Sequence, residues 1–169
     1  MNLPACACLP PDWIAMIARG VSTIVSSCGL DMRPSIMRAV GCAITPGGDS
    51  VTVYLSRPQS RQLLQDIAST GRIAAVFSEP TSHRTLQLKA TEAHIRCADT
   101  SDAPVLARYL ASMEHEIEAV GFSPAFTRAM LACRLDELVA VSFAPSHAFD
   151  QTPGPKAGAA LPGSSGSAA

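Results

Sequence analysis

The chain has 169 residues, 47% of them hydrophobic and 16% charged, and its formal net charge is −1. This length fits one domain with a substantial core, and the scattered Lys and Arg argue against sequence-independent nucleic-acid binding. The apolar runs are far shorter than the about 20 residues that span a bilayer. The first residues, MNLPACACLPPDW, also lack the basic start and continuous apolar region of a secretory signal. We therefore expect a cytoplasmic protein that engages neither nucleic acid nor membrane.

The cysteines and histidines show no metal-site spacing. Six cysteines occur, and only the pair Cys6 and Cys8 is close in sequence, so a zinc site is not expected. We expect reduced thiols, four of them as small core residues: Cys28, Cys42, Cys97 and Cys133. No pattern among the histidines predicts a metal, and no nucleophile elbow or dinucleotide fingerprint occurs. The sequence assigns no catalytic residue.

The first third of the chain predicts an arm, a helix and two strands. Residues 1–11 are expected to form a flexible arm that precedes one domain over 12–156. Asp12 can cap a short helix that ends at Gly20. β-forming residues at 21–27 predict a strand, and a turn at 29–31 leads to a second strand over 34–44. With a third strand after the turn at 46–49, these segments indicate an antiparallel meander.

The stretch from Ser50 to Gly71 predicts a strand followed directly by a helix. SVTVYL at 50–55 is rich in β-formers, Ser56 can cap the helix, and Gly71 can end it. The first turn of a helix has free backbone N–H groups and a dipole that favours an anion. Ser60 and Arg61 lie in this turn and offer a hydroxyl and a planar bidentate fork, which predicts a phosphate site. The alternative is a solvated first turn with a surface arginine.

The remainder alternates strands and helices. IAAVF at 73–77 is typical of a strand covered on both faces. A long strand is expected over 85–95, with Leu86, Leu88 and Ala90 on an apolar face and Thr85, Gln87 and Lys89 on a polar face that can meet a ligand or water. Helical spacing follows from about residue 99 to 120, and Ser123 starts another helix with Phe126 inside. A last strand is expected at 135–143, and 157–169 is expected to be a disordered tail.

Three motifs in this order resemble those of the pyridoxamine 5'-phosphate oxidase-like FMN-binding split-barrel family. Pro34-Ser-Ile-Met-Arg-Ala-Val40 looks like the family's first strand motif, Ser60-Arg61-Gln62 like its Ser-Arg-Lys phosphate turn, and Arg84-Thr-Leu-Gln-Leu-Lys-Ala90 like its Arg-Gln-Val-Arg strand. Residues 149–155 also look like a closing segment found in one branch. Gln62, Thr85 and Ala90 depart from the family residues Lys, Gln and Gly. The loss of the lysine weakens the phosphate site, although Gln62 can still donate a neutral hydrogen bond.

The resemblance implies a mainly β fold with peripheral helices, namely an antiparallel split β-barrel, and a homodimer with FMN at its interface. It implies that Ser60 and Arg61 bind the flavin phosphate, with Gln62 as a weaker helper. It places the following residues near the ring and ribityl chain: Arg38, Val40, Ser56, Arg84, Thr85 and Gln87. The function so implied is that of an FMN-dependent oxidoreductase acting on a small-molecule substrate.

Alternative functions remain open at this point. One is a non-catalytic protein that binds flavin, deazaflavin or haem, and in the haem case His83 or His147 would be a candidate iron ligand. Another is a structural dimer with an empty groove. Absorption spectra of the purified protein distinguish the three.

Overall fold

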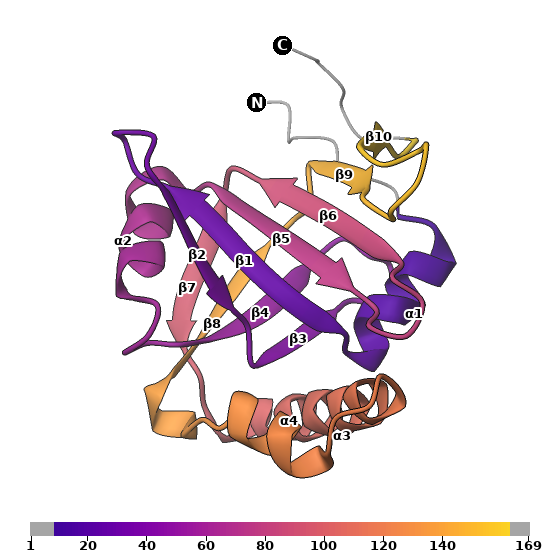
Figure 1. Cartoon of the computed structure of the whole chain (residues 1–169). Coiled ribbons are helices and arrows are strands. Elements are labelled where there is room, and N and C mark those ends of the chain that lie inside the picture. Colours follow the sequence, from indigo (N-terminus) through magenta and orange to yellow (C-terminus); the bar gives the residue numbers. More distant parts are fainter. Residues whose placement is uncertain (1–8, 163–169) are drawn as a thin grey trace.

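The computed structural model describes residues 9–162, so most of the expected N-terminal arm and the end of the expected tail lie outside the described residues. Within this range, four α-helices and two antiparallel sheets form the fold (Figure 1). The helices are α1 (Pro11–Arg19), α2 (Arg61–Thr70), α3 (Ala103–Ala119) and α4 (Pro124–Met130). The strands are β1 (Ser22–Cys28), β2 (Pro34–Arg38), β3 (Gly41–Ile44), β4 (Val51–Ser56), β5 (Ile73–Ser78), β6 (Thr85–Ala90), β7 (Ala93–Cys97), β8 (Leu138–Phe143), β9 (His147–Asp150) and β10 (Ala159–Ala160). The expected mainly antiparallel β fold with peripheral helices is confirmed.

The six-stranded sheet has the order β10-β9-β6-β5-β1-β2 and turns one side towards the core. Along β1, β5 and β6 every second side chain points inward and is buried, as Val25, Phe77 and Leu88 show. The opposite side, which we call the outer face, carries half-exposed side chains such as Ile24 and Val76. The prediction that 73–77 is covered on both faces is therefore wrong for this single chain.

The four-stranded sheet has the order β3-β4-β8-β7, and two expected long strands are each divided between the two sheets. The strand expected at 34–44 breaks at Ala39 and Val40, whose N–H groups donate to Thr23 of one sheet and Tyr54 of the other. The strand expected at 85–95 likewise divides into β6 and β7. Both predictions of one continuous strand are wrong, because pattern alone does not show where a chain passes from one sheet to the next. Closure into a split barrel stays a prediction.

Helix α2 begins later than the sequence suggested. Ser60, not Ser56, is its N-cap residue, and Gly71 ends it with φ 69°. A Cβ atom on Gly71 would lie 2.4 Å from the Thr91 carbonyl oxygen, so only glycine fits this turn. The turn brings the end of α2 against the link between β6 and β7.

Four further expectations need correction. Phe126 is 48% exposed and stacks on the exposed Phe122, so it is not inside. The strand expected from residue 135 begins at Leu138, and β9 and β10 follow it. Because β10 pairs with β9, ordered chain reaches into the segment expected to be a tail. Among the four cysteines expected in the core, only Cys42 is buried, and this burial raises the pKa of its thiol to about 11.

Between residues 9 and 162, no helix combines the length and apolar character needed to cross a membrane.

Candidate functional site

The N-terminus of α2 is the first candidate site. The Ser60 side chain is 1% exposed, and its hydroxyl has no hydrogen-bond partner among the described residues. It makes no side-chain cap to its own helix, and the first turn contains no acidic residue. A buried hydroxyl without a hydrogen bond costs folding free energy, so such groups nearly always have a partner. The helix therefore starts with unsatisfied donors and no internal anion.

The chain geometry around Ser60 explains why these donors remain free. The Ser60 N–H donates to the carbonyl of Ser56 at 2.9 Å, which folds the end of β4 directly into the helix. The first intrahelical acceptor is the Ser60 carbonyl, which receives the Leu64 N–H at 2.9 Å. The N–H groups of residues 61–63 precede that first bond, and such groups are the ones that hold anions at helix N-termini.

Arg61 is exposed and forms no ion pair within the described part of the chain. It lines a pocket of about 390 Å³ with Arg57, Pro58, Asp136 and Glu137. The two carboxylates of this pocket would repel an anion, but both contact Arg134, at 2.8 and 3.9 Å. This pairing lowers the pKa of Asp136 and partly neutralises the wall facing Arg61.

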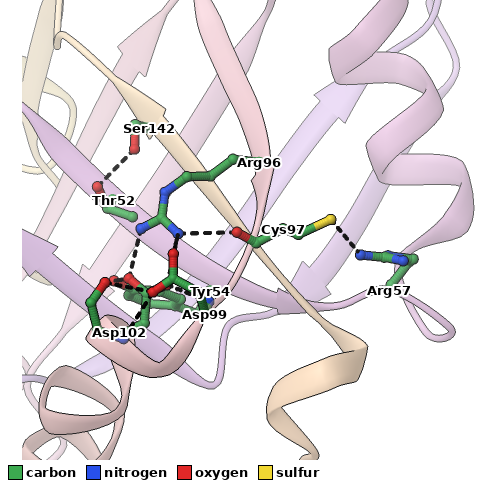
Figure 2. A network of polar contacts seen from close by, with 9 residues as sticks. Thr52, Tyr54, Arg57, Arg96, Cys97, Asp99, Asp102 and Ser142 are labelled. Carbon is green, nitrogen blue, oxygen red and sulfur yellow. Dashed lines mark hydrogen bonds and ion pairs between the residues drawn. The ribbon is translucent and has the colours of Figure 1, made fainter.

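Arg57 is the residue at this pocket that sequence reasoning missed. Its guanidinium donates to the sulfur of Cys97, the last residue of β7, at 3.1 Å (Figure 2). Its position just before Pro58, in the link between β4 and α2, could have indicated that it lies near the start of the helix. Gln62 lies one residue after Arg61, but its amide donates to Asp66 at 2.8 Å. A ligand role for Gln62 stays a prediction.

The outer face of the six-stranded sheet holds three more of the predicted site residues: Arg38, Thr85 and Gln87. Arg38 is the cross-strand partner of Ile24 and donates to the Ser22 hydroxyl at 2.9 Å. The hydroxyl groups of Thr85 and Ser78 form a hydrogen bond of 2.8 Å, and Gln87 is the cross-strand partner of Val76. These side chains combine hydroxyl, amide and guanidinium groups with apolar surface, a composition suited to a flat polar ring.

The other predicted residues lie apart from both places. Val40 is 9% exposed and belongs to the core, and Ser56 contributes its carbonyl to the start of α2. Arg84 donates to Asp12 at 2.6 Å and lies 4.4 Å from the centre of the Trp13 ring. No hydrogen bond among the described residues joins Arg84 to Arg61. The nine predicted residues thus divide between the start of α2, the outer face, the core and the neighbourhood of α1.

A polar network between the four-stranded sheet and α3 was not foreseen (Figure 2). Asp102, which is 4% exposed, accepts two hydrogen bonds from Arg96 at 2.6 and 2.7 Å. It also accepts from the Tyr54 hydroxyl at 2.8 Å and from the Asp99 N–H at 3.0 Å. Hydrogen bonds from Arg96 hold the pKa of Asp102 well below its usual range, and burial raises the pKa of Tyr54. Every charge here has a partner, which is typical of a structural network.

Comparison with solved structures finds this fold elsewhere. An F420 reductase superposes with a TM-score of 0.56 at 14% identity, covering 83% of this chain and 98% of that one. HupZ of Group A Streptococcus superposes with a TM-score of 0.54 at 12% sequence identity, covering 89% of this chain and 99% of that one. A Lactobacillus delbrueckii protein described as a pyridoxamine 5'-phosphate oxidase has a TM-score of 0.50 at 12% identity, covering 88% of this chain and 97% of that one.

These similarities show the fold, and at such identities they show nothing about the activity. The fold is one found among pyridoxamine 5'-phosphate oxidase-like proteins. No protein-family model matches the sequence, and no curated protein matches it.

Proposed function

We propose that the protein binds FMN, with the phosphate at the start of α2, and that it acts as a flavin-dependent oxidoreductase on a small molecule. The observation that carries this proposal is the unpartnered hydroxyl of Ser60 at a helix N-terminus that has no acidic residue in its first turn. A phosphate would accept hydrogen bonds from these groups and from the Arg61 fork. The residues present therefore fit the phosphate of a flavin.

The ring and ribityl chain would contact the outer face. Arg38, Thr85 and Gln87 present donors and acceptors there, and Ile24 and Val76 offer apolar surface. When bound, FMN supplies hydride or electron transfer at its isoalloxazine ring, while the protein supplies orientation and electrostatics. This division of labour agrees with the lack of an assigned catalytic side chain.

A second copy of the chain would cover the outer face and complete the site. Three large apolar side chains near β2 are exposed in the single chain: Leu30 by 85%, Met32 by 65% and Ile36 by 67%. Exposed apolar groups that cluster in this way mark interaction surfaces. A closed two-fold dimer would bury the same patch on both copies.

Titration with FMN, followed by flavin fluorescence, tests the phosphate site. We expect Arg61→Ala to weaken FMN binding about 10- to 150-fold, because a hydrogen bond to a charged group contributes about 1.5–3 kcal/mol. Arg128→Ala is the matched control, since Arg128 lies on α4 and pairs with Glu114. An affinity that is equal in wild type and Arg61→Ala would remove Arg61 from the site.

The absorption spectrum of the purified protein tests the choice of cofactor. Flavin bands support the proposal. A Soret band supports haem instead, and a colourless protein that takes up neither supports a structural dimer.

A further inference from the structure

A second pocket opens where the outer face meets the C-terminal end of α2. Its volume is about 380 Å³, within the range of pockets that hold small molecules. Three of its lining side chains carry a cation or an imidazole: Arg72, Lys89 and His147. Four others carry hydroxyl groups: Ser26, Ser27, Thr91 and Ser146. Of these seven residues, only His147 was a candidate from the sequence, as an iron ligand if the protein binds haem.

The strand register places the pocket residues side by side. Lys89 on β6 is the direct partner of His147 on β9 and of Ala74 on β5, and Ala74 in turn faces Ser26 on β1. One row across four strands therefore ends in a lysine and a histidine. Arg72 joins this row from the link between α2 and β5, two residues before Ala74.

The two cations in this pocket have no carboxylate partner within residues 9–162. The Arg72 guanidinium makes one contact of 3.5 Å with the Met32 sulfur, which is a weak acceptor. The Lys89 ammonium lies 5.0 Å from the centre of the Phe149 ring, a contact that keeps it in place without neutralising it. Glu92 lines the adjacent pocket and forms no ion pair with either of them.

Two hydroxyl groups of the pocket form hydrogen bonds with the backbone of its cationic residues. Ser27 donates to the Arg72 carbonyl at 2.7 Å, and Ser146 donates to the Lys89 carbonyl at 3.1 Å. Ser146 also contacts Nδ1 of His147 at 2.9 Å, which leaves Nε2 for another partner. The backbones that carry the three side chains are thus tied to neighbouring strands before any ligand arrives, a preorganisation that lowers the entropic cost of binding.

We infer that this pocket binds a small organic oxyanion, a carboxylate or a phosphate, held by Arg72 and Lys89. Arginine can bind either group through two parallel hydrogen bonds, and lysine adds a point charge. An anion would also reduce the repulsion between the two cations, since Arg72 lies two residues before Ala74, the cross-strand partner of Lys89. His147 would contribute a third polar contact.

This site is separate from the proposed flavin phosphate site. Arg72 follows the end of α2 and Arg61 begins it, and a helix of 10 residues is about 15 Å long. The inference goes beyond the proposed function and does not require that flavin binds.

Isothermal titration calorimetry of the flavin-free chain tests the inference, with inorganic phosphate and succinate as probes at low ionic strength. The titrations use the Arg61→Ala background, so that phosphate held at the start of α2 does not contribute. We expect saturable binding of at least one probe, weakened about tenfold or more by Lys89→Gln and by Arg72→Gln, the scale of one charged hydrogen bond. Lys156→Gln is the control, because it removes the same charge outside the pocket.

The outcomes separate cleanly. Binding of phosphate alone, of succinate alone, or of both supports the site and names the oxyanion it takes. No saturable binding of either probe would overturn the inference, and so would an equal loss in Lys156→Gln, which indicates nonspecific charge attraction. Neither result depends on the flavin titration, so failure of one proposal does not decide the other.

Discussion

Two groups of charged side chains on this fold differ in whether the chain supplies their partners. At the four-stranded sheet, Arg96 meets the buried carboxylate of Asp102, which also accepts from Tyr54. At the outer face of the other sheet, Arg72 and Lys89 line one pocket without a carboxylate partner in the described chain. The comparison teaches that the first group holds α3 to its sheet, whereas the second is available to a ligand.

The largest expected effect follows from breaking the paired group. Asp102→Asn would remove the main counter-charge of Arg96, leaving Asp99 at 3.8 Å, and disturb the acceptor of the buried Tyr54 hydroxyl. We expect the free energy of unfolding to fall by about 1–3 kcal/mol, because the buried Tyr54 hydroxyl loses its charged acceptor, whereas the half-exposed Arg96 side chain can still be hydrated. Urea unfolding monitored by circular dichroism measures this loss.

An exposed ion pair provides the control for that experiment. Asp136 contacts Arg134 at 2.8 Å, but both side chains are more than 60% exposed. Exposed pairs contribute little to stability, so Asp136→Asn should leave the urea midpoint unchanged. Equal midpoints for Asp102→Asn and wild type would show that the network does not stabilise the fold.

The same network predicts how stability depends on acid. The pKa of Asp102 is lowered in the folded chain, mainly by Arg96. Its contribution is therefore fully present above the unfolded pKa of about 3.9 and is lost as the pH falls from there towards the folded pKa. We expect the unfolding free energy of wild type to drop below about pH 4, with a shallower drop in Asp102→Asn. Urea titrations at several acidic pH values give both slopes, and parallel slopes would contradict the assignment.

Sequence patterns predicted the elements well where local chemistry decides them. Alternation placed Leu86 and Leu88 inside, and Gly71 ended α2 as expected. The patterns failed where the chain passes between sheets, at Ala39–Val40 and after Ala90, because both neighbouring strands have the same β-forming composition. Such a break depends on hydrogen bonds to distant residues, which no local window contains.

The candidate sites show the same limit. Ser60 and Arg61 were identified because a helix start has a local signature. The pocket of Arg72, Lys89 and His147 was missed, because it depends on the register that sets β6 beside β9. The Arg96–Asp102 pair was missed as well, since Asp102 lies within the helix expected from about residue 99 to 120 and nothing in that pattern points to Arg96.

The smallest expected effect concerns the unpaired group and its stability without ligand. Lys89→Gln removes an exposed cation whose cross-strand partner is His147 and not a carboxylate, so no internal ion pair is lost. We expect the unfolding free energy to change by less than about 0.5 kcal/mol, the usual range for surface substitutions.

Adding the probe that binds, at ten times its dissociation constant, should raise the stability of the Lys89-containing chain by about 1.4 kcal/mol, because it binds only the folded state. The same concentration should stabilise Lys89→Gln far less, as measured by thermal unfolding. A large loss of stability in ligand-free Lys89→Gln would mean that Lys89 already has a structural role, and the contrast between the two groups of charges would then fail.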